Sequence, residues 1–91
     1  MRIDKYLKIS RICKRRTVAK KLCDNGNVYY GKDEEKTIKP AYDVVEGDVI
    51  TIYMYTKRIV FKIEKLPENK NVSKQQAKKL YSIIEEENIE S

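Results

Sequence analysis

Apolar residues recur with helical spacing over the first quarter of the chain. An i, i+3, i+4 pattern predicts a short amphipathic helix that ends near Ile9. A second apolar stripe predicts a helix from about Arg15 to Asp24. This helix is expected to stop at Asn25-Gly26, because glycine readily adopts the left-handed conformation of helix ends. The stripe residues expected in the core are Ile3, Tyr6 and Leu7, then Val18, Ala19, Leu22 and Cys23.

The pattern then changes to the alternation that is typical of strands. Short strands are predicted at 28–30 and 37–39, separated by a polar, acidic loop. A longer strand is predicted over 49–55, with its isoleucines on one face. Residues 56–58 are expected to connect it to a returning strand over 59–63, so that the sheet is mostly antiparallel.

The last part of the chain returns to helical spacing. Ser73-x-x-Gln76 is a capping box, which marks the start of a helix. Ala77, Leu80, Tyr81 and Ile84 then follow helical spacing, and the acidic residues 85–87 oppose the helix dipole, so the last turn is expected to fray. The predicted fold class is α+β, with two short helices packed on a small sheet over residues 1–66. Residues 67–91 are predicted to be a linker and a C-terminal helix.

The basic charge is concentrated in the predicted helical pair. The chain has 20 Lys and Arg against 14 Asp and Glu, and nine of the basic residues lie among the first 23, with Asp4 as the single acid. A solubilising surface would scatter its charge, so a concentrated patch favours a face that binds a polyanion. Arginine suits bidentate phosphate contacts, and four of the chain's five arginines lie in this segment: Arg2, Arg11, Arg15 and Arg16.

Composition excludes several classes of site. With no histidine, the chain has no His-based catalytic triad and no His-ligated zinc site. Cys13 and Cys23 match no metal-binding spacing, and we expect two free thiols in a reducing cytoplasm, with Cys23 in the core. No apolar run reaches the length of a membrane span.

The tyrosines leave two interpretations open. Tyrosines on a sheet can stack on RNA bases, and tyrosine is also a favourable strand residue with one polar end. The structural interpretation is favoured for Tyr29, Tyr30, Tyr42, Tyr53 and Tyr55. Tyr6 and Tyr81 lie in helical stripes and are expected to be core residues.

An ordered set of short segments resembles a known family. Met-Arg-Ile-Asp-Lys-Tyr-Leu at 1–7 and Ser-Arg-Ile-Cys-Lys-Arg-Arg-Thr-Val-Ala at 10–19 are followed by Gly-Asn-Val, Lys-Pro and Glu-Gly-Asp-Val-Ile. Over residues 1–53 they resemble the alpha-L RNA-binding domain, the type found in small-subunit ribosomal protein S-four. The resemblance implies a helical pair on a small sheet that binds structured RNA. The RNA-contacting residues that it implies are Arg2, Lys5, Arg11, Lys14, Arg15 and Arg16, to which the helical pattern adds Lys20.

The whole chain is similar to the RqcP-type RNA-binding factors of ribosome-associated quality control, which are related to a small heat-shock ribosome-binding protein. This resemblance implies binding to the large ribosomal subunit, at ribosomal RNA and peptidyl-tRNA, and support of C-terminal tailing by a partner elongation factor. It implies a cytoplasmic monomer without catalytic residue, metal, cofactor or membrane partner, in which Asp4 orients its basic neighbours. The alternatives are a general structured-RNA binder, a heat-shock recycling factor and a DNA-binding protein.

Overall fold

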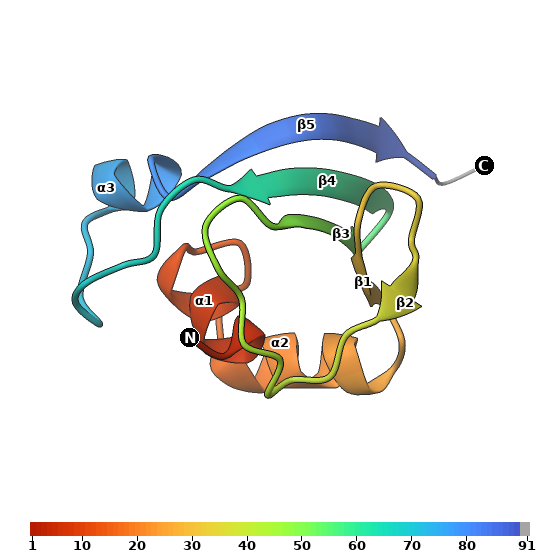
Figure 1. Cartoon of the computed structure of the whole chain (residues 1–91), viewed down its shortest axis with the longest axis horizontal. Coiled ribbons are helices and arrows are strands. Elements are labelled where there is room, and N and C mark those ends of the chain that lie inside the picture. Colours follow the sequence, from red (N-terminus) through yellow and green to blue (C-terminus); the bar gives the residue numbers. More distant parts are fainter. Residues whose placement is uncertain (90–91) are drawn as a thin grey trace.

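In the computed structural model, which describes residues 1–89, a five-stranded antiparallel sheet packs on two helices (Figure 1). The strands lie in the order β2-β1-β3-β4-β5. In chain order the elements are α1 (Ile3–Ile9), α2 (Arg16–Asp24), β1 (Val28–Tyr30), β2 (Lys36–Thr37), β3 (Val49–Met54), β4 (Lys57–Ile63), α3 (Lys74–Lys78) and β5 (Tyr81–Asn88). The predicted α+β class is confirmed. Within residues 1–89, no helix is long and apolar enough to cross a membrane.

Helices α1 and α2 form where the sequence predicts them and bury most of the predicted stripe. The three stripe residues of α1 are fully buried, and α1 ends where the Ser10 hydroxyl donates to the carbonyl of Leu7 at 3.3 Å. In α2, Ala19 and Cys23 are buried, whereas Val18 is 37% exposed. The prediction of Val18 as a core residue is therefore wrong, because α2 buries a narrower stripe than its apolar residues span.

The central hairpin of β3 and β4 supplies the sheet's part of the core. Ile50 and Ile52 of β3 and Phe61 and Ile63 of β4 are fully buried in one cluster with the stripe residues of α1 and α2. The Tyr6 hydroxyl crosses this core and donates to the carbonyl of Leu80 at 2.8 Å, which satisfies a buried polar group. The core positions of Tyr6 and of these strand residues are confirmed. Burial does not alternate strictly along the strands, since Thr51 and Val60 on the other face are fully buried as well.

The turn of this hairpin is shorter than the sequence predicts. Met54 pairs with Lys57, so Tyr55 and Thr56 alone make the turn instead of residues 56–58. Tyr55 has a φ of 58°, a left-handed conformation that is uncommon outside glycine, asparagine and aspartate. The sequence does not locate this turn, because residues 54–58 contain no glycine, asparagine or aspartate.

The start of α1 is held by main-chain hydrogen bonds to the segment before β3. The Ile3 amide donates to the carbonyl of Tyr42 at 2.8 Å, and the Val44 amide donates to the carbonyl of Met1 at 2.9 Å. The amino group of Met1 also forms an ion pair with Asp43. These contacts fix the backbone on both sides of Arg2 and so determine where its side chain leaves the fold.

The predicted C-terminal helix is wrong beyond Lys78. The capping box forms as predicted, with the amide of Gln76 donating to Ser73 Oγ and the amide of Ser73 donating to Gln76 Oε1, both at 3.1 Å. However, α3 has only five residues. The following segment forms β5, which pairs with the full length of β4 (Figure 1).

Tertiary pairing explains why β5 replaces a helix. Without β5, strand β4 would be a sheet edge with unpaired main-chain N–H and C=O groups. A neighbouring strand can form hydrogen bonds with these groups, whereas a helix uses its main-chain groups internally. Tyr81 and Ile83 lie opposite Ile63 and Phe61 in the register. The Tyr81 ring packs edge-on against Phe61 at 6.0 Å, whereas Ile83 is 47% exposed. The apolar spacing of residues 77–84 contains no information about the free edge of β4, so it favours a helix where the structure has a strand. The expected fraying of a last helical turn does not apply.

Candidate RNA interface

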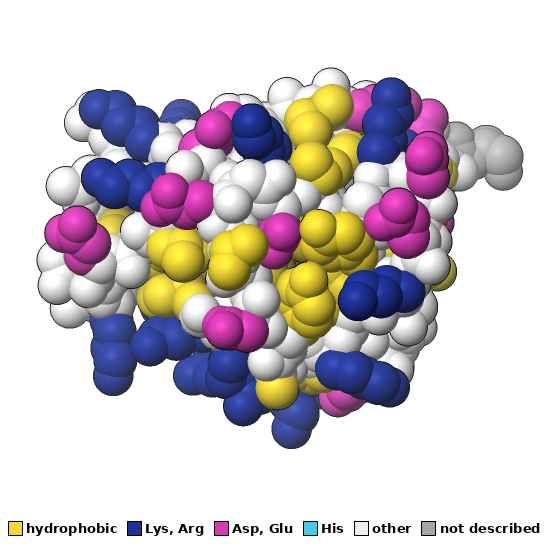
Figure 2. All heavy atoms as spheres, in the orientation of Figure 1, with side chains coloured by type: hydrophobic (Ala, Val, Ile, Leu, Met, Phe, Trp, Pro, Cys, Tyr) yellow, Lys and Arg dark blue, Asp and Glu magenta, His cyan; other side chains and the backbone are white. Residues whose placement is uncertain are grey.

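The predicted RNA-contacting side chains project from α1, the α1–α2 turn and α2. They are all exposed except Lys5, which is half-buried. In Figure 2 the lower margin of the molecule, beneath α1 and α2, is occupied mainly by Lys and Arg side chains. These seven residues are called the basic face below: Arg2, Lys5, Arg11, Lys14, Arg15, Arg16 and Lys20.

A buried carboxylate brings two of these arginines together. Arg2 donates through Nε and Nη2 to the two oxygens of Asp4, at 3.1 and 3.0 Å. Arg16 Nη2 lies 3.4 Å from Asp4 Oδ1. The Asp4 side chain is 3% exposed, whereas those of Arg2 and Arg16 are 48% and 49% exposed. The Arg2–Asp4–Arg16 cluster therefore has its acid in the fold and its two guanidinium groups at the surface.

The charge state of this cluster follows from its geometry. Burial opposes ionisation of Asp4, but the hydrogen bond from Arg2 and the charges of Arg16 and Arg2 outweigh it, so the pKa of Asp4 lies below its ordinary value. Asp4 is thus ionised at neutral pH, and the cluster keeps one net positive charge. The expectation that Asp4 orients its basic neighbours is confirmed for these two arginines.

The other cations of α1 and α2 have no such partner. Lys5, Lys14, Arg15 and Lys20 form no salt bridge with any carboxylate of residues 1–89. An unpaired surface cation keeps its charge-assisted hydrogen-bonding capacity for a ligand such as a phosphate. At these four positions the basic face is therefore electrostatically unsatisfied.

Arg11 occupies a special backbone position. It follows the C-cap Ser10 of α1 and has a φ of 65°. Helices usually place glycine there, because a side chain in this conformation costs about 1–2 kcal/mol. Arg11 Nη2 donates to the carbonyl of Val72 at 3.2 Å, so this exposed arginine connects the α1–α2 turn to the segment before α3.

This connection lies in an open groove that the sequence analysis did not identify. The groove has a volume of about 470 Å³ and lies between the α1–α2 turn and residues 70–74. Its five cations are Lys8, Arg11, Lys14, Lys70 and Lys74, and it is called the lysine groove below. Three of these cations are not predicted as RNA contacts from the sequence, because Lys8 lies outside the family pattern and Lys70 and Lys74 lie in a segment whose charges nearly cancel. A four-residue spacing of two lysines was the only signal.

Four of the five sheet tyrosines are engaged within the fold. The rings of Tyr29 and Tyr53 meet edge-on at 5.9 Å, and those of Tyr30 and Tyr42 at 6.1 Å. The Tyr53 hydroxyl also donates to Glu34 at 2.6 Å. These contacts give the tyrosines a packing role, as the structural interpretation expects. Tyr55 differs, because it is 83% exposed at the tip of the β3–β4 hairpin.

The two cysteines are buried free thiols. Burial raises the pKa of Cys13 to about 11. Burial, with a smaller contribution from the charge of Asp4, raises the pKa of Cys23 to about 12. Both thiols are therefore protonated at neutral pH and poor nucleophiles, and the predicted core position of Cys23 is confirmed.

Comparisons with known proteins identify the family of the chain. The S4 domain family matches residues 1–50, which include both helices and the basic face. The chain is 45% identical over 87 residues to a protein of Listeria monocytogenes named "RQC P-site tRNA stabilizing factor", covering 96% of this chain and 89% of that protein. A protein of the same name from Bacillus subtilis is 34% identical over 89 residues, covering 98% of both chains.

A solved structure supports the same assignment. Heat shock protein 15 of Vibrio cholerae, described as trimeric, has a TM-score of 0.80 and 28% sequence identity to this chain. The similarity covers 91% of this chain and 80% of that one. The resemblance seen in the sequence segments is thus confirmed over nearly the whole length. The chain belongs to the S4 domain family and, within it, to the family of the RQC P-site tRNA stabilizing factors.

Proposed function

We propose that this protein is a non-catalytic RNA-binding factor in the rescue of stalled ribosomes. It binds the large ribosomal subunit through ribosomal RNA and peptidyl-tRNA, as a monomer in the cytoplasm. There it supports C-terminal tailing of the nascent chain by a partner elongation factor. The observation that carries the proposal is the basic face, whose cations lie at the surface while Asp4 orients two of them.

The chemistry of this face suits folded RNA. Guanidinium groups held at fixed positions match phosphate oxygens in bidentate geometry, and unpaired lysines add charge without sequence preference. Engagement of about five phosphates would make affinity fall roughly 10²–10³-fold between 50 and 200 mM salt. Rigid placement favours a structured RNA over a flexible strand, because the spacing of the cations is set by the helices.

The names of the relatives support the finer part of the proposal. The proteins from Listeria monocytogenes and Bacillus subtilis are named for stabilising P-site tRNA in RQC. They align with this chain over nearly its full length, including β5 and the segment before α3. The same surface is therefore proposed to contact the tRNA of a stalled large subunit.

The proposal is tested by co-sedimentation with purified large ribosomal subunits that carry peptidyl-tRNA. Arg2→Ala and Arg16→Ala are each expected to lower affinity about 10- to 100-fold, the size of one lost charge-assisted contact. Each variant leaves Asp4 one arginine partner, so both should stay folded. Lys62→Ala is the control, because Lys62 is exposed on β4, outside the basic face. Unchanged co-sedimentation of both arginine variants would contradict the proposal.

A recycling factor of the heat-shock type is the second candidate, favoured by the similarity to heat shock protein 15. The two functions differ in their consequence for the nascent chain. A reconstituted reaction with stalled large subunits and the tailing factor should produce longer C-terminal tails when this protein is added. Release of the peptidyl-tRNA without tailing would favour the recycling function, and tighter binding to duplex DNA than to folded RNA would contradict both.

A further inference from the structure

The lysine groove gathers cations from two parts of the chain that are far apart in sequence. Lys8, Arg11 and Lys14 come from α1 and the α1–α2 turn, and Lys70 and Lys74 come from the segment that leads into α3. In Figure 1 the segment between β4 and α3 loops down to the left of α1, and its residues 70–74 line the groove together with the α1–α2 turn. All five cationic residues are exposed.

The composition of the groove determines what it can hold. None of its lining residues, all within the described part of the chain, is acidic or aromatic. Five like charges around one opening repel one another, and an anionic ligand relieves this repulsion. Because no aromatic ring is present to stack on a base or a nucleoside, the groove suits phosphate groups and carries no base recognition.

The position of the groove favours one kind of anion. Arg11 and Lys14 belong both to the groove and to the basic face, so the two surfaces are continuous. The groove is open and is lined by two separate chain segments, which suits a backbone that continues past it. A free phosphate or nucleotide would need an enclosed site with directed donors, and the cations here are exposed.

Both walls of the groove are held in place. Arg11 donates to the carbonyl of Val72, which joins the two segments at 3.2 Å. The capping box of Ser73 and Gln76 orders the backbone next to Lys74. Arg11 also keeps a left-handed backbone, with a φ of 65°, at a position where glycine is favoured. A strained residue kept at a charged surface points to a role in binding.

We propose that the lysine groove binds a second stretch of RNA sugar-phosphate backbone, through Lys70 and Lys74 together with Lys8, Arg11 and Lys14. The proposal rests on the proposed function and extends it, because it assigns part of the RNA contact to the segment after β4. The RNA thus leaves the basic face along the α1–α2 turn and continues between the turn and α3. Contacts in the groove add affinity and no sequence preference.

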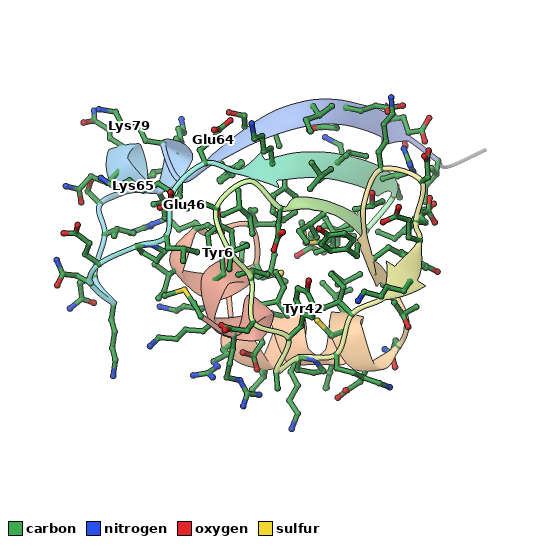
Figure 3. All side chains as sticks on the ribbon, viewed as in Figure 1. Tyr6, Tyr42, Glu46, Glu64, Lys65 and Lys79 are labelled. Carbon is green, nitrogen blue, oxygen red and sulfur yellow. The ribbon has the colours of Figure 1, made fainter. Side chains whose placement is uncertain are left out.

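The test measures the salt dependence of binding to large ribosomal subunits that carry peptidyl-tRNA. The double variant Lys70→Gln/Lys74→Gln should bind about 10- to 20-fold more weakly at 0.15 M salt, and its log–log salt slope should fall by about 1.4–1.8. The matched control is Lys65→Gln/Lys79→Gln, which removes the same charge from side chains at the upper left of Figure 3, outside the groove. It should leave both quantities unchanged.

A second variant separates binding from folding. Arg11→Gly removes the guanidinium group while glycine accepts the left-handed backbone, so the protein should stay folded and lose affinity. Equal losses for the groove variant and its control would overturn the proposal, since charge alone would then explain them. Unchanged binding by the groove variants, with loss in Arg2→Ala, would overturn the groove but leave the proposed function standing. Unchanged binding by Arg2→Ala and Arg16→Ala as well would overturn both.

Discussion

Two regions of the molecule hold arginine and lysine in opposite ways. Among residues 1–23 the cations are exposed apart from the half-buried Lys5, and Asp4 is the single acid. Where β4 and β5 meet the β1–β2 loop, the cations are surrounded by acids. Arg58 is 13% exposed there, against 48% for Arg2 and 49% for Arg16. The same side chain is thus held at the surface in one region and used for cohesion in the other.

The sheet side shows how complete this cohesion is. Arg58 Nε lies 3.0 Å from Glu34, and its Nη1 lies 3.7 and 3.4 Å from Glu85 and Glu87. Its Nη2 donates to the carbonyl of Lys32 at 2.7 Å. One arginine therefore connects the β1–β2 loop to β5. The acidic residues 85–87, expected to form a solvated helix end, instead join the last strand to the sheet.

The placement of acids, more than the number of cations, distinguishes the exposed basic face from the ion-pair network around Arg58. Thirteen of the fourteen acids lie after residue 23, and three of them, Glu34, Glu85 and Glu87, pair with Arg58. Single surface ion pairs contribute little to stability, but a half-buried arginine shared by three carboxylates forms a network. Three predictions test the distinction.

The largest effect on stability is expected from Arg58→Ala. The substitution leaves Glu34, Glu85 and Glu87 near one another without their shared cation, which should lower the free energy of unfolding by about 2–3 kcal/mol. Urea unfolding measures this, with Lys62→Ala as the control. The folded variant should bind large subunits as the wild type does. A loss of affinity that exceeds the loss of folded protein would contradict the separation of the two regions.

A smaller effect is expected from Asp4→Asn. The asparagine amide keeps the shape of the Asp4 side chain but lacks the charge that holds Arg2 and Arg16. The free energy of unfolding should therefore fall by about 1–2 kcal/mol. The substitution raises the net charge by one, yet affinity for RNA should fall because the two guanidinium groups lose their fixed positions. Parallel unfolding and co-sedimentation measure the two effects. Tighter binding would mean that charge, and not orientation, governs the basic face.

The smallest effect is expected in the pH dependence of stability. The pKa of Asp4 is below its ordinary value. The pKa of Glu34 is also below its ordinary value, because hydrogen bonds from Tyr53 and Arg58 outweigh the effect of its burial. A depressed pKa stabilises the fold above the unfolded-state pKa, and this contribution is lost as the pH falls through the folded-state value. Urea midpoints should therefore drop from about pH 5 downwards. Asp4→Asn should show a shallower drop, and an equally steep one would contradict the assignment for Asp4.

The N-terminal part of the fold could be predicted because its signals are local. The stripe of α1, the stop of α2 at Gly26 and the alternation of β3 are each encoded by neighbouring residues. The concentration of charge in the first 23 residues likewise indicates the basic face without any knowledge of the fold. Val18 is predicted to be buried but is exposed, since the width of the buried stripe of α2 depends on the elements that pack against it.

The C-terminal part could not be predicted in the same way. The apolar spacing of residues 77–84 favours a helix, and the observed strand depends on the free edge of β4, more than fourteen residues earlier in the chain. Lys70 and Lys74 illustrate the same limit for the candidate site. In sequence they lie in a polar linker, and only the descent of that linker beside α1 brings them to Arg11.

The helical pair, its charge and its resemblance to an RNA-binding family follow from local sequence, because helix stripes and charge runs are properties of adjacent residues. Contacts in the folded chain set which cations are neutralised, which segment completes the sheet and where a groove opens. These properties require residues distant in sequence to meet, and contacts of that kind depend on the packing of the whole chain, which periodicity does not describe.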